Sequence, residues 1–202
     1  MKIIACEQRS EEWFQARLGK PTASRFSEII TPTGKPSKSA EKYMSELLAD
    51  YLAGEPADSK ETTHYMDKGT EYEDEARKQF QFIYDIDVEQ VGFCLADNEK
   101  YGCSPDGLID NDGGIEIKVR KSNVLVEHYL KGMPSKVKCQ IQGSLLITGR
   151  KYWYYHAYHE KLYPFTVKVE RDEEFIGKME KALEEFCKEL EKKKEKLKDW
   201  KV

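Results

Sequence analysis

The sequence predicts one α/β domain in which helices flank a central mixed β-sheet. The chain has 202 residues, of which 39% are hydrophobic, so it can build one sizeable core. Segments with apolar residues at helical spacing share the chain with alternating or aromatic-rich segments typical of strands. No internal repeat or linker divides the chain, so residues 1–202 are expected to form a single domain.

Helical spacing dominates the first half of the chain. It predicts a short helix over 10–19, and a turn before Ser24 leads into a second helix. The apolar stripe of residues 40–53 indicates a helix that faces the core, and a longer helix is expected over 64–84. The polar or Pro-, Gly- and Ser-rich segments between these helices are expected to be loops, over 31–39 and 54–63.

The strands are expected in the second half. Apolar residues over 88–95 indicate a strand with an irregularity in its middle, and a hairpin is expected between 106 and 119. The aromatic run at 151–159 and the segment 163–169 predict two further strands.

The remaining segments of the second half are helical or polar. Residues 120–132 are polar, and His128 is expected at the surface because no second His or Cys stands at ligand spacing. Apolar spacing predicts helices over 135–147 and 172–198. The last helix approximates a heptad repeat, so it packs either on its own domain or at a subunit contact.

Charge and cysteine content narrow the class of protein. The formal net charge is −4, which counts mildly against a nucleic-acid binder, although net charge does not describe charge distribution. The five cysteines include no CxxC pair, so neither a zinc ribbon nor a disulfide framework is indicated. No apolar stretch approaches membrane-spanning length, so we expect a soluble cytoplasmic protein with no membrane partner.

One stretch carries the chemistry. Glu116 and Lys118 alternate with apolar residues and project from one strand face, and turn residues separate them from Asp106. This spacing suits a hairpin that brings Asp106 beside Glu116. Two adjacent carboxylates repel unless a cation neutralises them, and oxygen ligands suit Mg²⁺. With the lysine, the set indicates metal-dependent phosphodiester hydrolysis; the plainer alternative is a turn and the solvent face of a half-buried strand.

These residues spell P-D-(x)9-E-x-K, and the chain resembles the PD-(D/E)xK nuclease superfamily. More narrowly, it resembles the phage lambda exonuclease family, the YqaJ-type viral recombinases, over nearly its full length. The resemblance implies a restriction-endonuclease-like core. The matching blocks are Trp13 with Arg17-Leu18-Gly19, Thr22-Ala23-Ser24, Gly69-Thr70-Glu71-Tyr72-Glu73 with Ala76-Arg77, Cys103-Ser104-Pro105-Asp106-Gly107-Leu108, Glu116-Ile117-Lys118 and Gln140-Ile141-Gln142.

The resemblance implies roles for residues that spacing alone does not select. Asp106, Glu116 and the carbonyl of Ile117 would hold one or two Mg²⁺ ions, for which Mn²⁺ can substitute. Glu73, in the family's G-x-x-x-E pattern, would help to arrange the metal directly or through water. Lys118 would position or deprotonate the attacking water and offset transition-state charge.

Three further positions follow from the same resemblance, and a fourth departs from it. Residues two apart do not share a helix face, so only one of Gln140 and Gln142 is expected to reach the site, and the family pattern picks Gln140 as part of the catalytic set. Arg17 and Ser24 would bind the 5′ phosphate of the strand being degraded. Arg120 follows the E-x-K motif where the lambda exonuclease pattern has proline, and it is a candidate for an additional DNA-backbone contact.

The implied activity is Mg²⁺-dependent 5′-to-3′ exonuclease digestion of linear double-stranded DNA, releasing 5′-mononucleotides. The 3′ overhangs would serve a phage single-strand annealing protein, and family members form closed trimers in a bacterial host cell. Two alternatives stay open. One is a structure- or sequence-selective endonuclease of the same superfamily, and the other is a non-catalytic DNA-binding or assembly protein.

Overall fold

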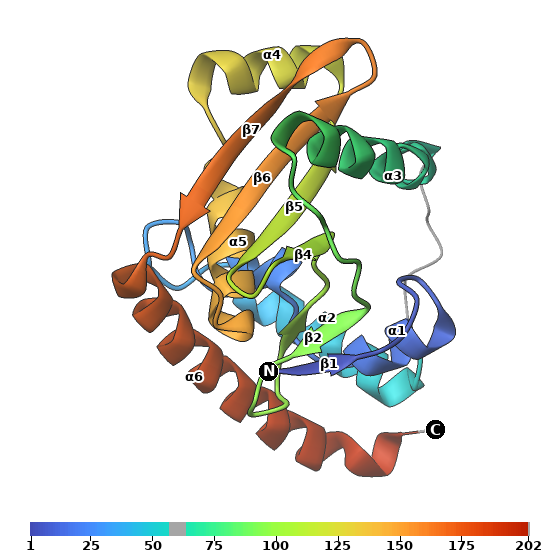
Figure 1. The fold of residues 1–202 in the computed structure, drawn as a ribbon. Coiled ribbons are helices and arrows are strands. Elements are labelled where there is room, and N and C mark those ends of the chain that lie inside the picture. The colour runs from blue at the N-terminus through green and yellow to red at the C-terminus, as the bar shows by residue number, and fades with distance from the viewer. Residues whose placement is uncertain (57–63, 202) are drawn as a thin grey trace.

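The computed structural model describes residues 1–56 and 64–201, with the side chains of 64–71 left undescribed. A four-stranded sheet has the order β4-β5-β6-β7, in which β5 and β6 are parallel and the other pairs antiparallel. A smaller antiparallel sheet has the order β1-β2-β3. The strands are β1 (Lys2–Ile4), β2 (Phe93–Leu95), β3 (Gly102–Cys103), β4 (Gly107–Ile109), β5 (Gly113–Val119), β6 (Tyr152–His159) and β7 (Leu162–Glu170). The mixed sheet predicted from the sequence is therefore confirmed (Figure 1).

The helices flank this sheet. They are α1 (Glu11–Arg17), the 3-10 helix η1 (Ala23–Glu28), α2 (Ala40–Ala53), α3 (His64–Tyr84), α4 (Ser122–Lys131), α5 (Ser135–Thr148), α6 (Glu173–Leu197) and the 3-10 helix η2 (Lys198–Trp200). The α-helices expected over 40–53, 64–84, 135–147 and 172–198 are confirmed to within one residue. None of the helices described has both the length and the apolar character that crossing a membrane requires.

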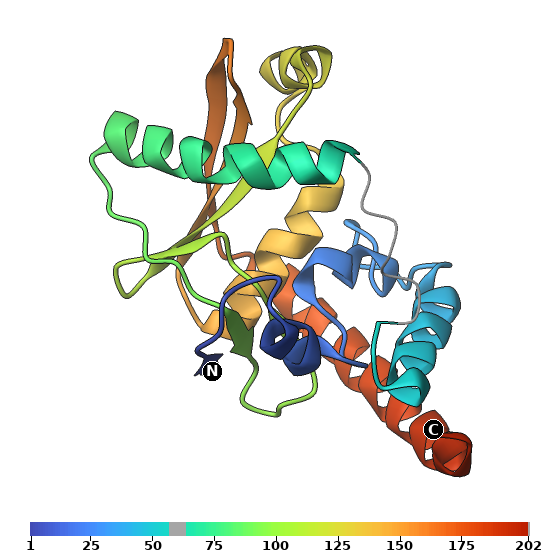
Figure 2. The ribbon, with the colours of Figure 1, turned by 90° about the vertical axis from the view of Figure 1, so that its right-hand side faces the viewer.

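Opposite faces of the sheet carry different cores. Alternation places Ile115 and Ile117 of β5 on the face that Phe80 of α3 covers. Trp153 and Tyr155 of β6 lie on the other face, against residues of α4 and α5. Figure 2 shows α3 crossing the strands on one side, while α4 and α5 lie on the other. The E-x-K side chains, which alternate with Ile115 and Ile117, therefore face the α4/α5 side.

The C-terminal helix α6 packs on its own domain. Its buried face includes Met179, Leu183 and Phe186, and α6 contacts α2 and α5. Phe186 stacks on Tyr43 of α2 with ring centroids 5.9 Å apart. Of the two packing modes considered for this helix, the structure shows the intradomain one, and a subunit contact through its exposed face stays a prediction.

Two predicted elements differ from the structure. The strand expected over 88–95 is regular only over Phe93–Leu95, and Glu89 makes an isolated bridge to Leu108 instead. The helix expected near Ser24 is a 3-10 helix that begins at Ala23, so Ser24 lies inside it rather than capping it.

The expectation for His128 was wrong. Residues 122–131 form α4, and His128 lies one turn after Leu125 on the buried side of that helix, with only 3% of its surface exposed. Its Nε2 lies 2.9 Å from the Tyr155 hydroxyl, and the two rings stack. The segment looked polar because α4 buries a histidine and leaves Leu130 exposed, which reverses the usual pattern of an amphipathic helix.

Candidate active site

The hairpin predicted from the sequence positions Asp106. Gly107 of β4 pairs with Ile115 of β5, and Asp106 directly precedes that pair. Gly107 leaves no room for a side chain, because a Cβ there would meet Val88 Cγ1 at 2.1 Å. The Asp106 Oδ2 atom accepts a hydrogen bond of 2.6 Å from the backbone N–H of Ile117. This contact fixes the Asp106 carboxylate at the edge of β5, beside the E-x-K motif.

The acid pair and the lysine lie together, as predicted. Glu116 is almost fully buried, with 2% of its side chain exposed, and its Oε1 pairs with the ammonium of Lys118. The Lys118 side chain is 31% exposed, so it reaches the surface of the site. Asp106, Glu116 and Lys118 line one cavity of about 160 Å³. The structure therefore brings together the three residues on which the interpretation of the motif depends.

The charges in this cavity influence one another strongly. Burial raises the pKa of Asp106 well above its usual range, and the neighbouring Glu116 raises it further. Burial disfavours the charged form of Lys118, but the carboxylates of Glu116 and Asp106 outweigh this effect and raise its pKa. Two crowded carboxylates with one shared ammonium form an oxygen-rich, electron-rich pocket. Such a donor set fits a hard divalent cation.

Glu73 of α3 faces the same cavity but has other partners. Its carboxylate pairs with Arg9 at 3.1 Å and with Arg77 at 3.3 Å, and it is 21% exposed. In the described ranges, no three His, Cys, Asp or Glu side chains gather closely enough to hold a metal ion. A ligand role for Glu73 stays a prediction.

Two contacts hold the surrounding segments in place, and the sequence interpretation missed both. Arg77 Nε donates to the carbonyl of Asp106 at 3.1 Å, which ties α3 to the hairpin. Gln8 Nε2 donates to the carbonyls of Val91 and Pro105, at 2.9 and 2.8 Å. Both contacts join residues far apart in the chain, so local patterning carries no signal for them beyond the presence of Arg77 in a matching block.

Arg17 forms the second part of the cavity with Trp13 and Ser104. The Ser104 hydroxyl accepts hydrogen bonds from Arg17 Nη1 at 2.8 Å and from Trp13 Nε1 at 2.9 Å. The Arg17 guanidinium lies over the Trp13 ring, 3.9 Å from its centroid. Burial lowers the pKa of Arg17 to about 10, so it stays charged at neutral pH. Ser104 was not assigned a role, although it directly precedes the Pro-Asp of the motif.

Ser24 lies on the same cavity. Its side chain is exposed, and its hydroxyl lies 3.2 Å from that of Thr22. Arg17, Ser24, Asp106 and Lys118 all line the cavity of about 160 Å³. Arg17 and Ser24, the two residues of the predicted phosphate pocket, thus line the same cavity as the acid pair.

The two glutamines of α5 separate as predicted. Gln140 lines the cavity. Gln142 is 1% exposed, and its amide donates to the carbonyl of Glu170 at 2.8 Å and accepts from the N–H of Asp172 at 2.9 Å. Gln142 is therefore a buried residue that fixes the junction between β7 and α6.

Comparison with known proteins agrees with this geometry. Residues 12–151 match the model of the YqaJ-like viral recombinase domain. A comparison with curated proteins finds no match. The chain is similar to an alkaline exonuclease, LHK-Exo, from Laribacter hongkongensis, with 34% identity and a TM-score of 0.85 over 94% of this chain and 97% of that one. The structure of LHK-Exo in complex with dAMP gives 33% identity, a TM-score of 0.85 and the same coverage.

A more distant structure shares the fold. A phage-related exonuclease from Haemophilus somnus 129PT has 16% identity and a TM-score of 0.70 over 88% of this chain and 96% of that one. The family match spans more than half of the chain and includes the P-D and E-x-K residues. The chain belongs to the family of proteins with a YqaJ-like viral recombinase domain, as the resemblance predicted.

Proposed function

We propose that the chain is a Mg²⁺-dependent exonuclease that degrades one strand of linear double-stranded DNA from a 5′-phosphorylated end and releases 5′-mononucleotides. One observation carries the proposal: the Asp106, Glu116 and Lys118 set shares a single cavity with the Arg17 and Ser104 pair. The relative LHK-Exo is described as an alkaline exonuclease and has been solved with a nucleoside monophosphate, dAMP, which supports this choice.

The metal would be held at the end of the hairpin. Asp106 and Glu116 would supply carboxylate oxygens. The N–H of Ile117 points to Asp106, and in a strand the carbonyl of the same residue points to the same side, so this carbonyl would supply a third oxygen. Glu73 would act through water, because it is engaged with Arg9 and Arg77. When bound, one or two Mg²⁺ ions supply Lewis acidity that offsets charge on the scissile phosphate, and Mn²⁺ can supply the same chemistry.

The chain's own residues position the reaction. The Lys118 ammonium, held by Glu116, faces the cavity and stabilises negative charge that develops on the phosphate oxygens. Because the carboxylates hold its proton, Lys118 serves here as a charge partner and not as a base. Gln140 lines the same cavity, where its amide can both donate to and accept from the attacking water.

The proposed preference of the enzyme for a 5′-phosphorylated end rests on the charge of the terminal phosphate. A terminal phosphate monoester carries up to about two negative charges, whereas each internal phosphodiester carries one. Arg17 pairs with the neutral Ser104 and, in the described part of the chain, with no carboxylate, so its charge is available to that terminal phosphate. Ser24 and Ser104 line the same cavity and add hydroxyl donors. A phosphate seated there would place the adjoining linkage at the acid pair.

Two further elements of the proposal follow from the family. Digestion from a 5′ end leaves a 3′ single-stranded overhang, which is the substrate of a phage single-strand annealing protein. A ring-shaped homotrimer around the duplex would keep the enzyme on its substrate between cuts. Both are predictions about partners of this site.

Digestion of end-labelled duplexes tests the proposal. Linear duplexes labelled at the 5′ or the 3′ end, with and without a 5′ phosphate, are incubated with the purified protein with Mg²⁺ or EDTA. We expect the 5′-labelled duplex to release labelled mononucleotide from the start of the reaction, and only when Mg²⁺ is present. The release should be faster when the 5′ end carries a phosphate. Closed circular duplex should resist digestion. Cleavage of the circle would indicate the endonuclease alternative, and no cleavage of any duplex would refute the proposal.

A further inference from the structure

Arg120 continues the row of charged side chains that begins with Glu116 and Lys118. Its backbone N–H donates to the carbonyl of Tyr158 at 2.8 Å, one step beyond the last paired residues, Val119 and Tyr158. The parallel ladder with β6 therefore fixes the backbone at Arg120, and the alternation directs its side chain to the face of Lys118. Two residues advance about 6.6 Å along a strand, which is of the order of the step between successive phosphates in a nucleic-acid strand.

The guanidinium of Arg120 lies near neutral groups. Its charge acts on the hydroxyl of Tyr155, which is 2.9 Å from His128 Nε2. Burial lowers the pKa of His128, and the Arg120 charge lowers it further, so the ring stays neutral at pH 7. The Arg120 Nε is buried without a hydrogen-bond partner. The rest of the Arg120 side chain is partly exposed, so an anion can compensate the charge of the guanidinium from the solvent side.

Arg120 also differs from most arginines of the described chain in lacking a counter-ion. Four of them pair with carboxylates, at positions 9, 25, 77 and 171. Arg150 donates to three backbone carbonyls instead. Arg17 and Arg120 have no carboxylate partner among the described residues; Arg17 lines the cavity of the acid pair, and Arg120 lies two residues beyond Lys118 on the same strand face. Two guanidinium groups without a carboxylate partner, one in the cavity and one further along the strand that carries Glu116 and Lys118, indicate a path for a single DNA strand.

We propose that Arg120 binds the phosphate on the 3′ side of the scissile phosphate. The strand would then place its terminal phosphate at Arg17, its scissile phosphate at Asp106, Glu116 and Lys118, and its next phosphate at Arg120. This proposal rests on the proposed function. It implies that Arg120 holds the shortened strand after each cut, so that the phosphate it binds becomes the next one cleaved.

A substrate with one neutral linkage tests this assignment. In a 5′-phosphorylated linear duplex, a single methylphosphonate replaces the second internucleotide linkage, and a matched duplex carries it at a linkage ten positions further in. Release of the first nucleotide is measured under single-turnover conditions with Mg²⁺. For the wild type, we expect the second-linkage substitution to slow release about tenfold or more, the size expected for a charge-assisted hydrogen bond.

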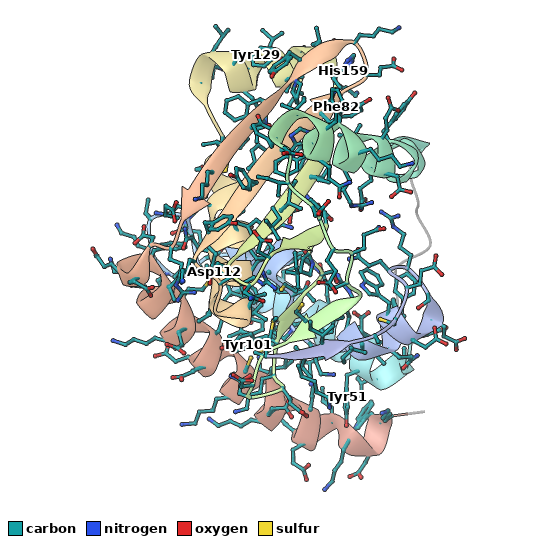
Figure 3. The ribbon with its side chains drawn as sticks, viewed as in Figure 1. Tyr51, Phe82, Tyr101, Asp112, Tyr129 and His159 are labelled. Atoms are coloured by element: carbon teal, nitrogen blue, oxygen red, sulfur yellow. The ribbon has the colours of Figure 1, made fainter. Side chains whose placement is uncertain are left out.

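The variants supply the second half of the test. Arg120→Ala should cleave the unmodified duplex about tenfold or more slowly and should lose no further rate with the neutral linkage. Arg120→Lys keeps the positive charge but loses the two parallel N–H donors of the guanidinium. It should retain part of the rate difference between the two duplexes. The control is Lys151→Ala. Arg120 lies at the end of the sheet near His159, whereas Lys151 pairs with Asp112 at the other end (Figure 3). The control variant should behave as the wild type.

The ratio of rates on the two duplexes cancels differences in the folded fraction of each variant. If Arg120→Ala keeps the wild-type ratio, or if the wild type does not distinguish the neutral linkage, Arg120 does not bind that phosphate. If the wild type cleaves no duplex at all, the proposed function fails instead, which is a separate result.

Discussion

The carboxylate of Asp106 accepts a hydrogen bond from the backbone N–H of Ile117 at 2.6 Å. This bond lies beyond the last paired residues of the hairpin, Gly107 and Ile115. It holds the acid against β5 at the level of the E-x-K residues, although burial and the charge of Glu116 raise its pKa. The backbone thus keeps two mutually repelling carboxylates together, which is the condition for a cation site.

Removing the Arg17 guanidinium should abolish the preference for a 5′ phosphate. Arg17→Ala deletes the cation that hydrogen-bonds Ser104 and would bind the terminal dianion. We expect the ratio of cleavage rates on 5′-phosphorylated and 5′-hydroxyl duplexes to fall about tenfold or more. Steady-state digestion of the two duplexes measures this ratio. An unchanged ratio would show that the terminal phosphate binds elsewhere.

Substitution of the two glutamines of α5 should have different effects, one on the cleavage rate and the other on the stability of the fold. Gln140→Ala removes an amide from the cavity wall and should slow cleavage while leaving the unfolding free energy close to that of the wild type. Gln142→Ala removes both hydrogen bonds of a buried amide and should destabilise the fold by about 1–3 kcal/mol. Urea unfolding and cleavage rates per folded molecule are measured for both variants. The reverse pattern would mean that the two assignments are exchanged.

Stability should rise with pH because of His156. Burial lowers the pKa of His156 to about 4 from its ordinary 6.5. Between these values the unfolded chain binds a proton that the folded chain does not, so the unfolding free energy increases with pH through this window. Below about pH 4, the unfolding free energy is lower by about 3 kcal/mol than at neutral pH because of His156 alone.

The variant His156→Phe isolates this effect from the carboxylates that titrate in the same range. Phenylalanine keeps an aromatic ring beside Phe80 and removes the titrating group. Urea unfolding between pH 4 and 7 should show a smaller pH dependence in the variant than in the wild type. Equal slopes would show that folding does not lower the pKa of His156.

The hairpin and most helices could be predicted because their signals are local. Alternation at residues 115–119 and the turn residues before them specify both the strand and its pairing partner. The helix over 40–53 is followed by Gly54, whose positive φ of 73° suits a helix C-terminus. In the site, Asp106, Glu116 and Lys118 follow from the same short-range pattern.

The remaining features depend on contacts between distant segments. The pairing of Glu73 with Arg9 joins positions 64 residues apart, so spacing did not distinguish Glu73 from neighbouring acids. Ser104 acquires its role from Trp13 and Arg17, which lie on another element. The burial of His128 depends on the hydroxyl of Tyr155, which offers a partner that the α4 sequence does not reveal. Tertiary contacts thus decided these cases.

The central claim is that Asp106 and Glu116 form one cation site for DNA cleavage. The most direct test measures the Mg²⁺ dependence of nucleotide release from a 5′-phosphorylated duplex by Asp106→Asn and Glu116→Gln. Asp112→Asn, in the exposed turn of the same hairpin, is the matched control. We predict that both site variants lose more than about a hundredfold in rate at every Mg²⁺ concentration while remaining folded, and that the control keeps the wild-type curve. Wild-type Mg²⁺-dependent rates in either site variant would contradict the account.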